Sequence, residues 1–252
     1  STDGTLDIVK KFLTDSRVCV IDLKKNIGTY AAKNLVLKNF AHGVYWAHHD
    51  ADDYSEPTRF ERQLQYLHTH DLDGCGTAVD EIYETGIEPQ IPSTEPLEIG
   101  EDGLRHRINQ YPERVTLDTI SVDIERLAQL KIFMNGTPLI RMQTMKELGG
   151  FDGRTYTGAD SDLLWRLVLR YSFGNMNEVL YHRRFHAESL TQSPATGWQS
   201  PRRKEYAARA LARHEERIRL VSLGKFEAAW NQAVEDMYYP DVPFMVLENL
   251  AL

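Results

Sequence analysis

Three aspartates stand close together near the start of this sequence, where a short apolar run ends. Asp50, Asp52 and Asp53 follow residues 44–47, a Val-Tyr-Trp-Ala run that predicts a buried strand. In an open α/β sheet, ligands gather at the carboxyl ends of strands, and carboxylates crowded there repel one another unless a cation or bound donors compensate them. Asp oxygens suit Mg²⁺ or Mn²⁺, and a substrate phosphate is the usual companion of such an ion. The spacing therefore predicts a site for a hard divalent cation and a phosphate group.

A structural interpretation of the same stretch stays open. Residues 53–57 also have the composition of a loop that leads into a helix, with Ser55 as the N-cap and Pro57 in the first turn. In that case the acids would be loop residues with no chemical role. The residues alone favour neither interpretation.

A second group of acids stands at the predicted start of another helix. Asp160 and Asp162 open a segment whose apolar residues recur at helical spacing as far as residue 171. Asp160 or Ser161 occupies the position of an N-cap, which is an ordinary use of Asp. Asp162 is well placed to interact with the helix dipole and needs no other role. By themselves, the residues favour a structural role for both acids.

Hydrophobic periodicity predicts the elements that position these acids. Helices are expected over residues 5–13, 29–40, 57–70, 122–130, 144–148, 160–171, 201–223 and 225–237, and strands over 17–23, 44–47, 77–83, 131–134, 139–142 and 176–181. The strand, helix, strand order at the start, with short links, implies a parallel sheet with a right-handed crossover. Residues 86–114 are rich in Pro, Glu and Gly without periodicity, which predicts a long surface loop.

Composition limits what the acids can belong to. The 252 residues suffice for one α/β domain with an appendage or for two small domains. The 29 basic and 37 acidic residues give a net charge of −8, so there is no general reason to expect a nucleic acid partner. Cys19 and Cys75 cannot build a disulfide framework, and no apolar run approaches the roughly 20 residues of a membrane span. We expect a soluble protein.

The C-terminal part is expected to be a charged helical hairpin. Residues 201–223 are rich in Ala and Arg, and a second helix follows them. The simplest interpretation of this charge is a solvated face. The alternative is a patch for an acidic lipid or polymer, which would give the protein a peripheral membrane contact.

Six short motifs follow one another along the chain: Ser1-Thr2-Asp3-Gly4-Thr5, Asn26-x-Gly28, Lys33-Asn34, Asp50-Ala51-Asp52-Asp53 with Pro57 after it, Gly149-Gly150-Phe151-Asp152, and Gly158-Ala159-Asp160-Ser161-Asp162-Leu163. In this order and spacing they resemble the family 2 inverting glycosyltransferases of the GT-A fold, over roughly the first 190 residues. The Glu-Asp pair usual in that family is Ala159-Asp160 here, which keeps the second acid. Arg184-Phe185-His186 with Ser189 is similar to the Arg-x-His and serine element that follows the last core strand in many relatives.

The resemblance implies an α/β fold of GT-A type, an open, mainly parallel sheet flanked by helices, with a C-terminal helical appendage. It implies that a sugar moves from a nucleoside diphosphate sugar to a hydroxyl group with inversion at the anomeric carbon. The nucleotide site would contain Asp3, Asn26, Gly28, Asn34, Asp50 and Asp52. A Mn²⁺ or Mg²⁺ ion would be held by Asp52, with Asp50 and His186 as further ligands, and Asp160 would be the general base.

The same resemblance sets expectations for the partners. The expected donor is a UDP-sugar, and the expected acceptor is a hydroxyl-bearing glycan or a lipid-linked molecule. The reaction would belong to polysaccharide or glycoconjugate synthesis, in the cytoplasm or at the inner face of the membrane.

Two further expectations concern the extent of the domain. The transferase domain is expected over residues 1–198, with a helical extension over residues 199–252. In the family, the Ser-Thr-Asp-Gly-Thr element comes after a first strand, a helix and a second strand, so we expect a front portion of the domain to precede residue 1. The strand over residues 17–23 should then lie beside an unpaired edge, with apolar surface exposed near it.

Two rival functions remain. A phosphohydrolase can also place an Asp-x-Asp sequence after a strand, with the first Asp as a nucleophile. The small residues and the separate Lys site that serve such a nucleophile are not evident after Asp53, where Tyr54 follows. A non-catalytic module that binds a nucleotide or a sugar is favoured by the absence of the Glu from the Glu-Asp pair.

Overall fold

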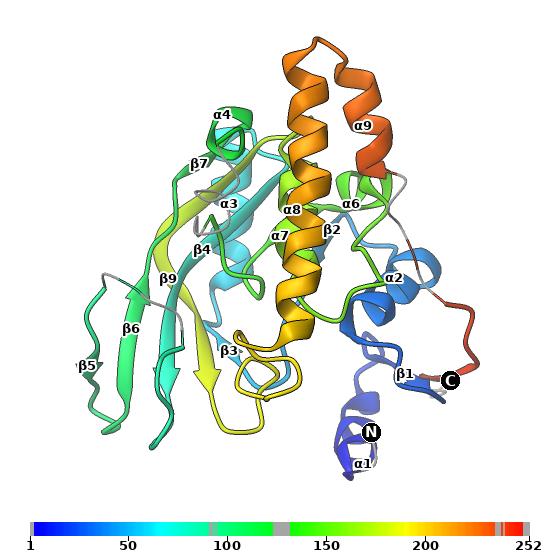
Figure 1. Cartoon of the computed structure of the whole chain (residues 1–252). Coiled ribbons are helices and arrows are strands. Elements are labelled where there is room, and N and C mark those ends of the chain that lie inside the picture. Colours follow the sequence, from blue (N-terminus) through cyan, green and yellow to red (C-terminus); the bar gives the residue numbers. More distant parts are fainter. Residues whose placement is uncertain are drawn as a thin grey trace.

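The computed structural model describes residues 3–90, 93, 95–122, 132–234, 238 and 240–248 (Figure 1). The helices are α1 (Thr5–Lys10), the short 3₁₀ helix η1 (Lys11–Thr14), α2 (Thr29–Asn39), α3 (Arg59–His70), α4 (Leu117–Ile120), α6 (Met142–Leu148), α7 (Ala159–Leu167), α8 (Pro201–Ser222) and α9 (Phe226–Val234). The strands are β1 (Cys19–Leu23), β2 (Tyr45–Ala47), β3 (Tyr54–Ser55), β4 (Gly74–Tyr83), β5 (Glu98–Ile99), β6 (Arg105–Asn109), β7 (Arg114–Val115), β8 (Leu139–Arg141), β9 (Phe173–Phe185) and β10 (Phe244–Glu248).

The central sheet contains eight strands, and most neighbouring strands run antiparallel. Its path is β2-β8-β4-β6-β5, and β9 lies against β4 while pairing also with β3 and β7. Of the strand pairs in the described residues, β4–β9 is the parallel one. The predicted α/β class, with a many-stranded sheet flanked by helices, is confirmed. The prediction of mainly parallel strands is wrong, because hydrophobic periodicity fixes the faces of a strand and not its direction.

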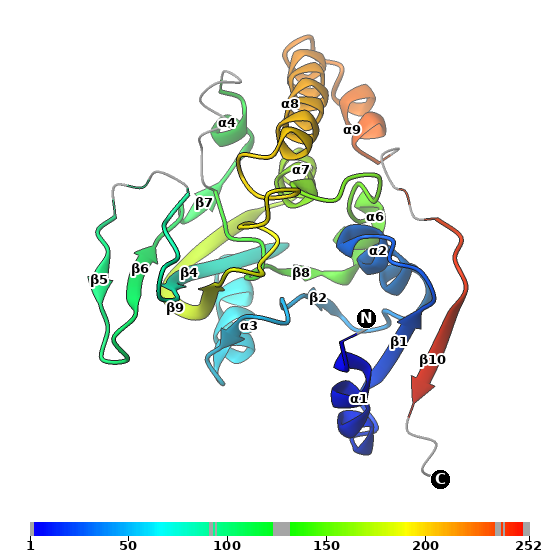
Figure 2. The same ribbon diagram turned by 60° about the horizontal axis from the view of Figure 1, so that its bottom comes forward.

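Strand β1 lies outside the central sheet. It pairs antiparallel with β10, and Figure 2 shows these two strands beside α2 and apart from the other eight. The predicted parallel crossover from residues 17–23 to residues 44–47 is therefore wrong. The other edge of β1 has no strand partner among the described residues. Ile8 and Phe12, in the helices that precede β1, are 57% and 61% exposed, so apolar surface is exposed near this strand, as expected.

The helices form layers against the sheet. Figure 1 shows α3 on one side of β4 and β9, and α7 with α8 on the other. Leu163, Leu164 and Leu167 recur at helical spacing on α7 and are buried in the main apolar core. Trp230 of α9 belongs to the same core. The C-terminal hairpin thus packs on the helix that carries Asp160.

Local chemistry explains where α8 begins. Ser200 is the N-cap, and its hydroxyl accepts a hydrogen bond from the backbone N–H of Arg203 at 3.2 Å. Pro201 occupies the first helical position, where its missing N–H costs nothing. The predicted hairpin is confirmed as α8 and α9, within a few residues at each end.

Three segments differ from their predicted structure or lie outside the described part. The loop predicted over residues 86–114 contains β5 and β6, and β6 is hydrogen-bonded to β4. Residues 132–134 form no strand, while the helix predicted over residues 122–130 falls almost entirely outside the described residues. Among the described helices, none has the length and apolarity that a bilayer-spanning segment needs.

Carboxylates and imidazoles alternate in a series of contacts across β9, β4 and β6, from Glu56 after β3 to Asp102 before β6. His182 contacts Glu56 at 2.8 Å and Asp80 at 3.3 Å, and His106 contacts Asp80 at 2.9 Å and Asp102 at 3.0 Å. The hydrogen bond to Asp80 raises the pKa of His182. Burial acts to lower the pKa of His106, but its hydrogen bonds to Asp80 and Asp102 raise it. We call these five residues the Asp80 chain.

Candidate active site

One cavity of about 830 Å³ brings together acids from distant parts of the sequence. The residues after β2, the first turn of α7, and the segment between β9 and α8 line it. Its lining includes Asp50, Asp52 and Asp53, which follow β2, and Asp160, which is more than 100 residues further along the chain. The predicted cation site and the predicted base therefore line one cavity.

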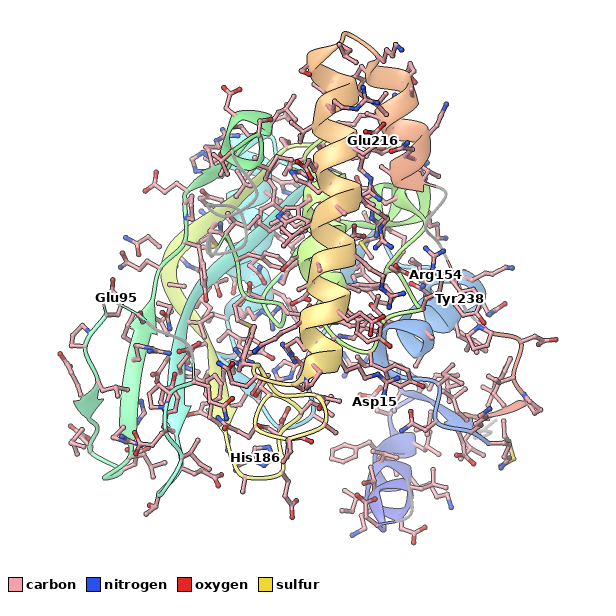
Figure 3. All side chains as sticks on the ribbon, in the orientation of Figure 1. Asp15, Glu95, Arg154, His186, Glu216 and Tyr238 are labelled. Carbon is pink, nitrogen blue, oxygen red and sulfur yellow. The ribbon has the colours of Figure 1, made fainter. Side chains whose placement is uncertain are left out.

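Asp52 contacts a histidine that is far away in sequence. Its Oδ2 lies 3.1 Å from Nε2 of His186, which sits in the loop after β9 (Figure 3). The Asp52 side chain is 41% exposed and the His186 side chain is 22% exposed. Two of the three predicted metal ligands are thus adjacent and accessible.

Asp50 faces a lysine rather than this histidine. Nζ of Lys33, on α2, lies 3.7 Å from the Asp50 carboxylate. Burial lowers the pKa of Lys33, while Asp50 and Asp160 act in the opposite direction. The Nζ atom of Lys33 is buried and forms no hydrogen bond within the described residues, so it can donate to a ligand that enters the cavity.

Asp53 anchors the acidic run to β9. It accepts hydrogen bonds from the Tyr181 hydroxyl at 2.7 Å and from the backbone N–H of Arg184 at 2.9 Å. Burial raises the pKa of Asp53 to about 6, although these two donors act to lower it. Asp53 therefore fixes the position of the neighbouring Asp52.

Asp160 lies in the first turn of α7, and it is not the cap. The N-cap is Gly158, whose backbone is left-handed with a φ of 81°, and no side chain caps the helix. The predicted capping role of Asp160 or Ser161 is therefore wrong. The Tyr30 hydroxyl donates to Asp160 Oδ1 at 3.1 Å, and burial, followed by the charge of Asp160, raises the pKa of Tyr30 well above its ordinary value. Asp160 is held by one hydrogen bond and keeps a face toward the cavity.

Asp162, two residues further on, is a structural residue. Its carboxylate contacts Arg166 at 2.8 Å, Arg217 at 3.0 Å and Arg213 at 3.8 Å. Burial acts to raise the pKa of Asp162, but these arginines lower it to about 2. The side chain is 1% exposed, which rules it out as an alternative base that meets a substrate.

The other predicted nucleotide contacts do not line the cavity. Asp3 accepts hydrogen bonds from Thr5, and Asn26 accepts one from the backbone N–H of Gly28 at 2.9 Å. Asn34 is 1% exposed and donates to the carbonyl oxygens of Phe151 and Tyr238. The backbone N–H of Phe151 donates to the oxygen of the Asn34 amide. Asn34 therefore ties α2 to the chain after α6, which leaves its amide no room for a nucleotide.

Asp52 and His186 could supply part of the coordination shell of one hard divalent cation, and a bound substrate and water would have to supply the rest. The described residues contain no cluster of three or more His, Cys, Asp or Glu side chains with the geometry of a complete metal site. Mg²⁺ and Mn²⁺ sites in enzymes commonly use one or two protein ligands and complete their shell with water and substrate phosphates. The Asp52 carboxylate and the His186 imidazole match that partial set. Asp50, which faces Lys33, is the weaker of the predicted ligands.

The cavity is also lined by Tyr30, Lys33 and Arg203, to which the sequence analysis assigned no function. Lys33 stands in a motif quoted above, and its position on the same helix face as Tyr30 was a usable signal. Arg203 gave no signal, because it belongs to a charged helix whose composition indicates a solvated face.

The first half of the chain is similar in sequence to a known protein family. Residues 1–125 match the sequence pattern of glycosyl transferase family 2. We identify this stretch, about half of the chain, as a family 2 glycosyltransferase sequence. The resemblance found in the motifs is confirmed.

Two relatives from Bacillus subtilis (strain 168) carry glycosyltransferase names. TuaG, named for teichuronic acid biosynthesis, is 38% identical over 68 residues, which cover 27% of each chain. EpsE, named as a glycosyltransferase, is 28% identical over 207 residues, which cover 78% of this chain and 63% of EpsE. The chain thus spans only part of the length of either relative.

The fold is also similar to that of TarS from S. aureus. Residues 1-349 of TarS in complex with UDP-GlcNAc match with a TM-score of 0.59 and 17% identity, over 94% of this chain and 68% of TarS 1-349. The complex of TarS 1-349 with UDP matches with a TM-score of 0.53 and 14% identity, over 100% and 86% of the two chains. These matches confirm the GT-A-like fold of this chain.

Proposed function

We propose that this protein catalyses a metal-dependent, inverting transfer of a sugar from a nucleoside diphosphate sugar to a hydroxyl group. The observation that carries the proposal is the shared cavity, which contains the Asp52 carboxylate next to His186 and, in the same volume, Asp160 held by Tyr30. One corner suits a cation with a diphosphate, and the other suits a proton acceptor. The match of residues 1–125 to glycosyl transferase family 2 supports the same reaction.

Asp160 is the proposed general base. The acceptor hydroxyl gives its proton to the free side of the Asp160 carboxylate, its oxygen forms a bond to the anomeric carbon, and the bond from that carbon to the diphosphate oxygen breaks. The nucleoside diphosphate leaves with the bonding electrons. Tyr30 donates to the other side of the carboxylate and keeps it in place during the transfer.

Charge on the leaving diphosphate is compensated from the opposite corner. Asp52 and His186 would hold Mn²⁺ or Mg²⁺, which supplies Lewis-acid stabilisation of the diphosphate oxygens when bound. Lys33 adds a buried ammonium group between Asp50 and Asp160. Its hydrogen bonds to phosphate oxygens would be strong because the Lys33 ammonium group is charged and buried.

A UDP-sugar is the proposed donor class. The similarity of the fold to TarS, whose structures contain UDP-GlcNAc and UDP, supports this choice. The proposed acceptor is a hydroxyl-bearing glycan or lipid-linked molecule in polysaccharide or glycoconjugate synthesis. The proposed place of action is the cytoplasm or the inner face of the membrane.

Two substitutions test the two corners separately. Asp52→Asn should abolish the Mn²⁺-dependent part of UDP binding, measured by calorimetry with and without the ion. Asp160→Asn should leave that binding unchanged and reduce sugar transfer by about 10²-fold or more. A wild-type protein that hydrolyses a phosphate ester but leaves UDP-sugars intact would instead be a phosphohydrolase. Binding of UDP without turnover in the wild type would indicate a binding module.

A further inference from the structure

Arg203 reaches the cavity from α8 and is held in one orientation. Its Nε donates to the carbonyl oxygen of Thr196 at 2.8 Å, and its guanidinium carbon lies 4.4 Å from the centre of the Trp198 ring. A hydrogen bond and a stacked aromatic ring together fix the planar group. The two terminal nitrogens, which form the fork of the guanidinium, are left for a ligand.

Arg203 also differs from the other cations of the cavity in its charge environment. Each of the others has a carboxylate partner: Lys33 with Asp50 at 3.7 Å, Arg183 with Glu81 at 3.8 Å, and Arg184 with Glu84 at 2.6 Å. Arg203 forms no ion pair with any described residue. A fixed guanidinium without a carboxylate favours an anionic ligand, because its fork matches phosphate and carboxylate oxygens.

The neighbours of Arg203 place it on the acceptor side of the reaction. Arg203, Asp160 and Tyr30 line the same cavity, and Tyr30 donates a hydrogen bond to Asp160. Burial lowers the pKa of Arg203, and the negative charge of Asp160 opposes that effect. This step depends on the proposed function, in which Asp160 accepts the proton of the acceptor. Because attack and departure occur on opposite faces of the anomeric carbon, the surroundings of the base contact the acceptor and not the leaving diphosphate.

We propose that Arg203, held on Trp198, forms an acceptor subsite that selects molecules with a phosphate or carboxylate group close to the reacting hydroxyl. The fork of Arg203 binds the anionic group. The hydroxyl is thereby directed to Asp160. The aromatic ring of Trp198 keeps the fork in position and contributes no charge of its own.

Binding of a hexose 6-phosphate, compared with the matching uncharged hexose, tests this subsite. Each sugar is titrated by NMR into wild-type protein that has been saturated with UDP and Mn²⁺, so that the proposed diphosphate corner is filled. The variant is Arg203→Gln, and the matched control is Arg209→Gln, an exposed arginine on the same helix. UDP binding to all three proteins is measured in parallel.

The proposal expects the dissociation constant of the hexose 6-phosphate to rise by about 10- to 100-fold in Arg203→Gln, the range for loss of a charge-assisted hydrogen bond. The constants for the uncharged hexose and for UDP should not change, and Arg209→Gln should behave as wild type. Competition between the hexose phosphate and UDP, or weaker UDP binding in Arg203→Gln, would assign Arg203 to the donor and overturn the proposal. Equal constants for the two sugars in the wild type would also overturn it.

The same titration separates this proposal from the proposed function. If wild-type protein binds no UDP, the donor part of the function fails, while the hexose 6-phosphate titration of wild type and Arg203→Gln still decides whether the anion subsite exists. A lower turnover in Arg203→Gln with an unchanged acceptor KM would show that Arg203 acts through Asp160 and would refute an acceptor subsite.

Discussion

Replacing Asp162 by Asn should destabilise the protein strongly without touching the cavity. The substitution keeps the shape of the side chain but leaves Arg166 and Arg217, which are 0% and 1% exposed, without their shared anion. Removing one partner from a buried ion pair costs about 3–5 kcal/mol. The depression of the Asp162 pKa from 3.8 to about 2 corresponds to about 2–3 kcal/mol. We expect the larger figure, because the pKa reports the carboxylate alone, whereas the variant also removes the anion that the buried arginines share.

Urea denaturation of wild type, Asp162→Asn and Asp160→Asn measures this effect. At neutral pH, Asp162→Asn should lower the free energy of unfolding by about 3–5 kcal/mol, or Tm by roughly 6–20 °C. Asp160→Asn carries the same chemical change two residues away and should cost less than about 1 kcal/mol. Because the pKa of Asp162 is depressed in the fold, its contribution is complete above about pH 4 and is lost as the pH falls through about 2. A small effect at neutral pH, or one that does not shrink in acid, would refute the reasoning.

The contribution of the Asp80 chain to the free energy of unfolding should have the opposite pH dependence, because the pKa values of His106 and His182 are raised in the fold. Such histidines stabilise the fold fully below about pH 6.5 and lose that contribution as the pH rises through the folded pKa. Urea midpoints of wild type and Asp80→Asn should thus differ more at about pH 6 than at about pH 8.5. The pKa of Asp53 is raised to about 6, so the metal-free protein should lose up to about 3 kcal/mol of stability between about pH 4 and 6.5, and Asp53→Asn should not. Burial raises the pKa of Cys75 to about 12, so a thiol reagent at about pH 8 should label Cys19 in the folded protein and Cys75 only after unfolding.

Much of the fold was predictable because local patterns carry it. The helices of the chain show clear periodicity, and their ends lie near the predicted positions in α2, α3 and α8. Strands β5 and β6 were missed because a segment rich in Pro and Gly gives no alternating pattern, yet β6 gains its partners from β4. The pairing of β1 with β10 joins the two ends of the sequence, and no local signal reports such a contact.

The candidate site divides in the same way. The position of Asp52 after a strand follows from local sequence. Its contact with His186, 134 residues away in the chain, was expected from the family resemblance and not from hydrophobic periodicity or residue spacing. Local sequence also could not rank Asp160 against Asp162. The arginines that make Asp162 structural come partly from α8, 55 residues further along the chain. Tertiary contacts therefore decide that Asp160, and not Asp162, is available to a substrate.

Helix α8 connects the stability of the fold to the chemistry of the cavity. Arg217 in its C-terminal half bonds to Asp162 on α7, and Arg203 near its start lines the cavity together with Asp160. Helix α8 thus holds the first turn of α7 through the bond from Arg217 to Asp162. The same helix places the guanidinium of Arg203 in the cavity that Asp160 lines. The charge of α8 has two separate uses, since arginines on its buried face hold α7 while those on its outer face meet solvent. A helix that composition indicates to be a solvated hairpin is, in the folded chain, a wall of the site.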